Sequence, residues 1–276
     1  MELGDGHQGH GGGIAAAAGA GAGDAVLDAL QVVGDGGHDV PTLGAVAARL
    51  KPTYAGGKGA WQERGRRGSG RRQAPLPRLW LFSDPVRLPD PAPAAAVLPR
   101  GSGVVARGVE SGRLPDLARR VRQRGGVLLL GGTPRMALRL RAGLHLPDRA
   151  PPPGMAAFRL ARRAGAPGAL LSAAAHGAAG LRRARRQGVD LVFLSPLFAT
   201  PSHPGAPFLG VWRWAALARR AACPVMALGG ITATTAPRIP PQACGFGAIT
   251  ALLHPGHSVS MKSRGAQGEH CPPGSA

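Results

Sequence analysis

The stretch that decides the fold is DLVFLSPLFATPSHPGAPFLG, which runs from Asp190 to Gly210. It opens with an unbroken apolar run, Leu191 to Leu194, and changes at Ser195-Pro196 into a loop of small hydroxyls, a histidine and two glycines. A short apolar run without polar alternation is typical of a strand that is buried on both faces, as in a parallel sheet. The loop that follows is either a ligand-binding segment or a plain proline-rich turn.

Similar apolar runs recur on both sides of this stretch, and most are separated by segments with helical periodicity. The predicted strands are 79–83, 103–107, 126–130, 143–146, 168–172, 190–194, 224–228 and 246–250. The clearest predicted helices are 114–125, 134–143, 177–188 and 211–222. Eight such units favour an α/β fold, a single (β/α)8 TIM barrel, with a doubly wound open sheet as the second choice.

The chain divides by composition into three parts. Residues 1–75 are rich in Gly, Ala and Arg and are predicted to be a disordered extension, residues 76–253 the barrel, and residues 254–276 a flexible tail. The first crossover, 84–101, and the seventh, 232–245, are rich in proline, so their helices should be short or broken. No clear eighth helix follows Thr250.

The net charge of +20 comes almost entirely from arginine. These arginines alternate with apolar residues in the predicted helices, which indicates solvated helix faces rather than a nucleic-acid site, and a basic surface favours small anionic substrates. No apolar run reaches the ~20 residues of a membrane span, the start lacks a secretory pattern, and the three cysteines have no metal-binding spacing. A cytoplasmic protein with no membrane partner is expected, and its oligomeric state is left open.

In a barrel of this kind, ligands bind at the carboxyl ends of the strands. Gly229 and Gly230 follow the seventh predicted strand, and Ile249 and Thr250 end the eighth. Glycines let backbone N–H groups approach an anion, so a phosphate site is predicted at these two strand ends.

Hydroxyls and imidazoles follow the neighbouring strands. Thr200, Ser202 and His203 lie after the sixth predicted strand, next to the expected phosphate site, and can donate hydrogen bonds to phosphate oxygens. His176 and His145 lie at the ends of the fifth and fourth predicted strands; each is either a catalytic group or a hydrogen-bonded structural residue.

Three stretches, DLVFLSPLFATPSHPGAPFLG, CPVMALGGIT and GFGAIT, resemble in order and spacing the thiamine-phosphate synthase/TenI family. LWLFSD resembles its first strand and SAAAH the end of its fifth. The resemblance implies a (β/α)8 barrel and a transferase of thiamine biosynthesis that condenses hydroxymethylpyrimidine diphosphate with thiazole phosphate and releases diphosphate. It also implies Mg²⁺ as cofactor if this reaction is retained, and none otherwise.

The resemblance assigns roles at single positions. It implies substrate binding by Arg107, Thr200, Ser202 and by His203 in a position that is usually lysine. It implies thiazole-phosphate binding by Gly229, Gly230, Ile249 and Thr250. His176 and His203 are the predicted catalytic residues.

The metal positions depart from the family pattern. Asp148 is the one predicted metal ligand, and Gly131-Gly132 stands where the family has Asn-Asp. Two alternatives stay open: a TenI-type thiazole tautomerase, although Pro196 replaces the histidine attributed to those enzymes, and a non-catalytic member that binds thiazole phosphate.

Overall fold

The computed structural model describes residues 43–50, 75–200 and 204–252. Ser202, His203 and both predicted terminal segments, apart from residues 43–50 and 75, therefore lie outside the described residues.

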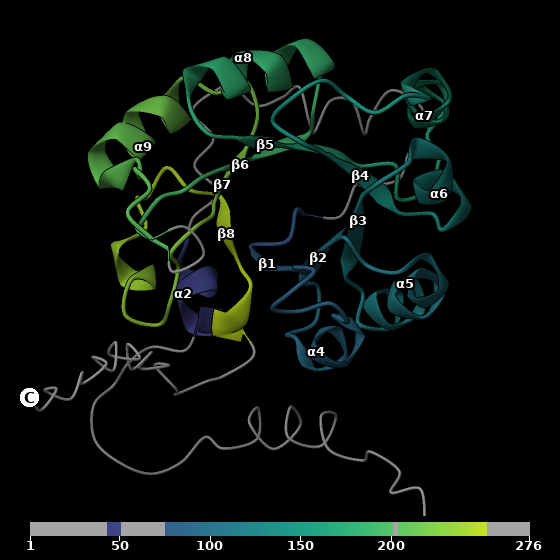
Figure 1. Cartoon of the computed structure of the whole chain (residues 1–276), viewed down its shortest axis with the longest axis horizontal. Coiled ribbons are helices and arrows are strands. Elements are labelled where there is room, and N and C mark those ends of the chain that lie inside the picture. The colour runs from purple at the N-terminus through teal and green to yellow at the C-terminus, as the bar shows by residue number, and fades with distance from the viewer. Residues whose placement is uncertain (1–42, 51–74, 201–203, 253–276) are drawn as a thin grey trace, which may run out of the picture.

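Eight parallel strands form a closed barrel in sequential order, which confirms the predicted (β/α)8 fold over the open sheet (Figure 1). The strands are β1 Leu79–Phe82, β2 Gly103–Arg107, β3 Val127–Gly131, β4 Gly143–Leu146, β5 Leu171–Ala175, β6 Leu191–Leu194, β7 Val225–Ala227 and β8 Gly245–Ala248. β8 pairs with β1 through Leu79 to Phe246 and Leu81 to Ala248, and this pairing closes the barrel.

The helices lie around the outside of the barrel. They are α4 Ala92–Val97, α5 Leu114–Gln123, α6 Pro134–Arg139, α7 Met155–Arg163, α8 Ala178–Gln187 and α9 Gly210–Arg219, with 3-10 turns η1 Ser111–Arg113, η2 Ala236–Arg238 and η3 Thr250–Leu252. The two proline-rich crossovers contain only the six-residue α4 and the three-residue η2, as predicted. Among the described residues no helix is long and apolar enough to cross a membrane.

The fifth strand lies three residues beyond its predicted position. Strand β5 begins at Leu171 rather than at Gly168, because Gly168 is in a turn with a φ of +75°. The strand then continues through three alanines, which have low intrinsic strand preference. Pairing with both β4 and β6 holds them in the sheet.

Large aromatic side chains fill the interior of the barrel. Trp80, Phe82 and Phe193 are fully buried there, with ring centroids of Phe82 and Phe193 4.8 Å apart in an edge-to-face arrangement. Glycines on neighbouring strands make room for them: a Cβ on Gly103 would lie 2.1 Å from the Trp80 ring, and one on Gly247 2.7 Å from Phe82. The aromatic layer closes the interior beneath the carboxyl ends of the strands.

His145, on β4, belongs to this buried interior. It is 5% exposed, its ring packs edge-to-face on Phe82 and Phe193, and its Nδ1 lies 2.9 Å from Ser172 Oγ. Burial, helped by the nearby charge of Arg107, lowers the pKa of His145 to about 3. His145 is therefore a neutral structural residue, the second of the two roles expected for it.

We expect this buried imidazole to make the barrel less stable in mild acid. The unfolded chain protonates His145 near pH 6.5, whereas its pKa in the folded barrel is about 3. Between these values the unfolded chain binds more protons, so the free energy of unfolding falls as the pH is lowered. Urea unfolding should show a loss of about 2 kcal/mol between roughly pH 7 and pH 5. The loss should be smaller in His145→Leu; an equal loss in that variant would assign the effect to other groups.

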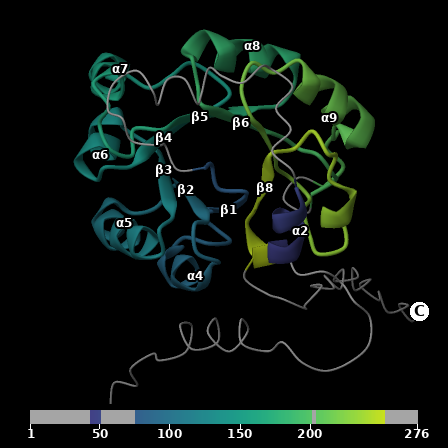
Figure 2. The same ribbon diagram turned by 180° about the vertical axis from the view of Figure 1, so that it is seen from behind.

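A short helix from the N-terminal segment packs against the barrel. Helix α2, Leu43–Arg49, buries Leu43, Val46 and Ala47, contacts η2, and accepts a hydrogen bond at Ala48 O from Arg78 Nη1 at 3.0 Å. Both views show it beside β8 and η3, where the barrel has no long helix among its described residues (Figures 1 and 2). Residues 43–49 were predicted to be part of a disordered extension, and this prediction was wrong for them. Tertiary packing supplies the stability that so short a helix lacks alone.

Candidate functional site

The carboxyl ends of the strands gather polar groups and glycines on one rim of the barrel. Side chains alternate between the two faces of each strand. Positions 103 and 105 of β2 face the interior of the barrel, so Arg107 lies on the inner side of the rim. By the same alternation on β8, Gly247 and Ile249 face inward, and Ile249 packs against the buried cluster that contains Trp80 and Phe82. The barrel therefore brings Arg107 and Ile249, predicted from distant parts of the sequence, to the same rim.

The loop after β6 is bonded directly to the end of β7. Leu197 N donates to Leu228 O at 2.9 Å, and Phe198 N donates to Gly229 O at 3.1 Å. The far side of the loop is attached as well, since Leu209 N donates to Pro196 O at 2.9 Å. The predicted substrate loop and the predicted phosphate glycines thus form one corner of the rim.

Gly229 and Gly230 are required by the backbone at this corner. Their φ angles are +91° and +67°, in the left-handed region that favours glycine. A Cβ on Gly230 would lie 2.2 Å from Ala199 O and 2.7 Å from Phe198 O, so the two chain segments are in close contact. Thr200, which is partly buried, follows this contact directly. On the neighbouring strand β8, Thr250 follows the strand end and is the first residue of η3.

A threonine turn after Gly230, which was not predicted from the sequence, supports the corner. Thr235 Oγ1 donates to Gly230 O at 2.8 Å and accepts from Thr232 N at 2.9 Å. Thr235 N in turn donates to Thr232 Oγ1 at 3.2 Å. The Thr-x-x-Thr spacing is the available signal, because threonine hydroxyls commonly bond to backbone groups in such turns.

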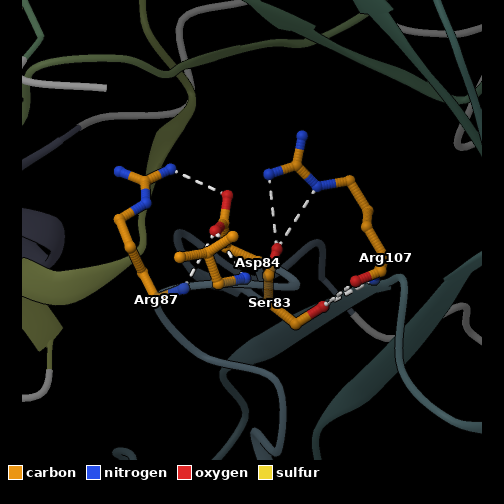
Figure 3. A network of polar contacts seen from close by, with 5 residues as sticks. Ser83, Asp84, Arg87 and Arg107 are labelled. Atoms are coloured by element: carbon orange, nitrogen blue, oxygen red, sulfur yellow. Dashed lines mark hydrogen bonds and ion pairs between the residues drawn. The ribbon is translucent and has the colours of Figure 1, made fainter. Parts of the chain in front are cut away.

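A second polar cluster lies at the ends of β1 and β2 (Figure 3). Ser83 Oγ donates to Arg107 O at 2.8 Å and accepts from Arg107 N at 2.6 Å, which fixes the backbone of Arg107. The Arg107 guanidinium lies 5.1 Å from the centre of the Phe82 ring and donates long hydrogen bonds, of 3.3 and 3.4 Å, to Ser83 O. Burial lowers the pKa of Arg107.

Asp84 and Arg87 complete this cluster. Asp84 accepts from Arg87 Nη2 at 2.9 Å and from the backbone nitrogens of Val86 and Arg87 at 3.1 and 3.0 Å. The hydrogen bond from the Arg87 side chain is the main cause that holds the pKa of Asp84 far below its usual value, against the opposing effect of burial. Arg87 was not predicted as a site residue.

Asp148 and His176 form a third cluster, with Arg183 of α8. Asp148 Oδ2 accepts from His176 N at 3.0 Å and lies 2.9 Å from His176 Nδ1. Asp148 Oδ1 accepts from Nη2 and Nε of Arg183 at 2.6 and 3.1 Å. Burial opposes ionisation of Asp148, but these hydrogen bonds outweigh it and lower its pKa. A cavity of about 180 Å³ lies beside the cluster, lined in part by Asp148, Arg149 and Arg183.

The residues of this rim do not fit the magnesium site that the resemblance implies. Both carboxylate oxygens of Asp148 already accept hydrogen bonds from Arg183 and His176. Gly131 and Gly132 offer no side-chain ligand at the end of β3. Within residues 43–50, 75–200 and 204–252, no group of three His, Cys, Asp or Glu side chains is placed to hold a metal ion. Magnesium usually binds one or two carboxylates together with waters and substrate phosphates. Of the two expected positions, the end of β3 has no carboxylate, and Asp148 is already bound by Arg183 and His176.

The fold and the rim define a (β/α)8 barrel of the class that places its functional groups at the carboxyl ends of its strands. The family model described as "Thiamine monophosphate synthase" matches residues 113–251, about half of the chain. The chain belongs to this thiamine monophosphate synthase family.

Individual relatives agree with the assignment. The chain is 34% identical over 90 residues to "Putative thiamine-phosphate synthase 2" of Aquifex aeolicus (strain VF5). The matched part is 33% of this chain and 45% of the relative, less than half of its length. Among solved structures, "Thiamine phosphate pyrophosphorylase from Pyrococcus furiosus" has a TM-score of 0.52 and 19% identity, over 64% of this chain and 87% of its own. At that identity the likeness supports the shared fold.

Proposed function

We propose that this protein is a thiamine-phosphate synthase, which joins hydroxymethylpyrimidine diphosphate to thiazole phosphate and releases diphosphate. The observation that carries the proposal is the corner between β6 and β7, in a chain of this family. There Gly229 and Gly230 take up left-handed conformations in close contact with the loop that leads to Thr200. Pro196, in place of the tautomerase histidine, counts against the TenI-type alternative.

The glycine corner is the proposed site for thiazole phosphate. Gly229 and Gly230 let the backbone turn in left-handed conformations against the loop after β6, and Thr235 fixes the Gly230 peptide through its carbonyl oxygen. Together with Ile249 and Thr250 of the adjacent strand end, this backbone can receive a phosphate group by N–H donation. The corner therefore positions the acceptor substrate on one side of the rim.

Arg107 is the proposed group for the diphosphate of the second substrate. When the bond to diphosphate breaks, the leaving oxygen takes the electron pair and gains negative charge, which a fixed cation stabilises. Arg107 lies on the inner side of the rim, and no carboxylate among the described residues forms a salt bridge with it. It can therefore bind a phosphate group through its own donors.

His176 is proposed to contact the substrates, with Asp148 as the residue that positions it. The bond from Nδ1 to Asp148 fixes the ring, and the His176 side chain is 57% exposed. A carboxylate on one ring nitrogen leaves the other available as a donor or acceptor. Thr200, Ser202 and His203 are proposed, from sequence alone, to bind the diphosphate.

Growth complementation tests the proposed function directly. The full chain should restore growth without thiamine to a strain that lacks thiamine-phosphate synthase. Arg107→Ala should reduce that growth, while the exposed-helix variant Arg119→Ala should grow like the wild type. No growth with soluble, folded protein would contradict the proposal.

The histidine at the usual lysine position predicts a pH-dependent affinity for the pyrimidine diphosphate. A free imidazole has a pKa near 6.5, so binding that uses protonated His203 should weaken between about pH 6 and pH 8. His203→Lys should remove this dependence, and His203→Ala should cost on the order of 1.5–3 kcal/mol near pH 6. Calorimetric titration measures all three proteins. Wild-type affinity in His203→Ala would show that this side chain does not bind the diphosphate.

A further inference from the structure

We propose that Arg87 joins Arg107 in a diphosphate site that works without a divalent cation. This guanidinium pair lies at the carboxyl ends of β1 and β2, and the expected magnesium positions after β3 and β4 do not fit the ion. The identity of the anion rests on the proposed function; the site itself rests on the geometry of these two side chains.

Arg107 is a cation that forms no salt bridge among the described residues, although the charge of Asp84 is near enough to favour its charged form. Its guanidinium is partly buried on the Phe82 ring, and its hydrogen bonds to Ser83 O are long. Burial is the main cause that lowers its pKa, which means that desolvation works against its charge. An anion bound there would relieve this cost, since a desolvated charge is stabilised by a close opposite charge.

Arg87 lies in a small loop after β1 that is closed by backbone hydrogen bonds. Asp84 N donates to Leu88 O at 3.2 Å and Leu88 N donates to Asp84 O at 2.9 Å, so the loop is closed by two backbone bonds. Asp84 then holds the Arg87 guanidinium through one nitrogen, Nη2. The remaining N–H groups of Arg87 are therefore available to a ligand.

The guanidinium groups of Arg87 and Arg107 face the same region above the ends of β1 and β2. Figure 3 shows them extending to the same side, with Ser83 and Asp84 between them. Besides burial, the charge of Asp84 raises the pKa of Arg107 and the charge of Arg87 lowers it, so both charged groups lie near the Arg107 guanidinium. Asp84 offsets one of the two positive charges, which leaves the cluster with one in excess.

Paired guanidinium groups suit a diphosphate better than a single phosphate. Each guanidinium is planar and can bind two oxygens of one phosphoryl group, and two of them can bind both phosphoryl groups. The other titratable side chain near Arg107, His145, has a pKa of about 3 and stays neutral. Fixed cations can supply the charge that a metal ion would otherwise bring.

Calorimetric titration with inorganic pyrophosphate, in EDTA and at fixed ionic strength, tests the proposal on the full chain. We expect the wild type to bind pyrophosphate without metal, and added Mg²⁺ to change the affinity little. Arg87→Gln should weaken binding about 10-fold and Arg107→Gln about 100-fold, as expected for charge-assisted bonds. Pyrophosphate binding that requires Mg²⁺ would overturn the proposal.

Arg119→Gln is the matched control, because Arg119 also pairs with an aspartate three residues earlier, Asp116, but lies on exposed α5. It removes one positive charge from a protein of net charge +20 and should leave the affinity unchanged. Equal losses in Arg87→Gln and Arg119→Gln would mean that general charge attraction, not a site, binds pyrophosphate. Circular dichroism checks that each variant is folded.

The outcome is separable from that of the proposed function. Metal-free pyrophosphate binding without formation of thiamine phosphate would uphold the anion site and reject the synthase assignment. Product formation together with Mg²⁺-dependent pyrophosphate binding would uphold the synthase assignment and reject the metal-free anion site.

Discussion

Replacing Gly230 by alanine is expected to lower the free energy of unfolding by about 4 kcal/mol and to abolish measurable binding of thiazole phosphate. Two effects add at this position. Alanine is strained at a φ of +67°, and its Cβ would lie 2.2 Å from Ala199 O and 2.7 Å from Phe198 O. Both obstacles are backbone atoms, so the loop after β6 must move away from β7. Urea unfolding and calorimetric titration measure the two effects.

Gly132→Ala is the matched control for this prediction. Gly132 lies at the end of β3 on the same rim, and a Cβ there would meet nothing within 4 Å. Its φ is outside the left-handed region, so alanine should be tolerated with little change in stability. If Gly230→Ala were as stable as Gly132→Ala, the close contact between the two loops would be wrong.

Replacing Asp148 by alanine is expected to lower the free energy of unfolding by about 3 kcal/mol at neutral pH. The side chain is 10% exposed and accepts hydrogen bonds from Arg183, from the His176 ring and from the His176 backbone. Because the pKa of Asp148 is lowered on folding, this stabilisation is present above about pH 4 and is lost as the pH falls through the folded pKa. Asp116→Ala, at an exposed carboxylate with two arginine partners, should destabilise the protein much less, because solvent screens exposed ion pairs.

Asp148→Ala also distinguishes between two roles of Asp148, a structural anchor and a metal ligand. If Asp148 anchors β5 and α8, unfolding measured with EDTA and with millimolar Mg²⁺ should give the same stability in the wild type and the same loss in Asp148→Ala. Stabilisation of the wild type by Mg²⁺ that disappears in Asp148→Ala would instead support the metal role that the sequence predicted.

The barrel was predictable because its signals are local and repeated. Apolar runs of four to five residues alternate with helical periods, and each strand except β5 lies within two residues of its predicted bounds. The displacement of β5 comes from Ala173, Ala174 and Ala175, which carry almost no strand signal of their own. Helix α2 escaped notice because its apolar spacing, Leu43, Val46, Ala47 and Leu50, is hidden in a segment rich in glycine and alanine.

The positions of the candidate residues were predictable where they follow a strand directly, and their contacts were not predictable where these depend on distant partners. Gly229 and Gly230 were placed at the end of the seventh strand because paired glycines follow its apolar run. The pairing of Asp148 with Arg183 joins residues 35 apart in sequence, and only the packing of α8 against β5 brings them together. The contact of Arg87 with Asp84 was missed for a related reason, since it depends on how the loop after β1 closes.

The most direct test of the synthase assignment is product analysis with the purified full chain. It is incubated with hydroxymethylpyrimidine diphosphate and thiazole phosphate, and both thiamine phosphate and released diphosphate are quantified against reactions that lack either substrate. The account predicts the two products in equal amounts, with formation strongly reduced in Arg107→Ala. Absence of thiamine phosphate from folded protein that binds thiazole phosphate would contradict it.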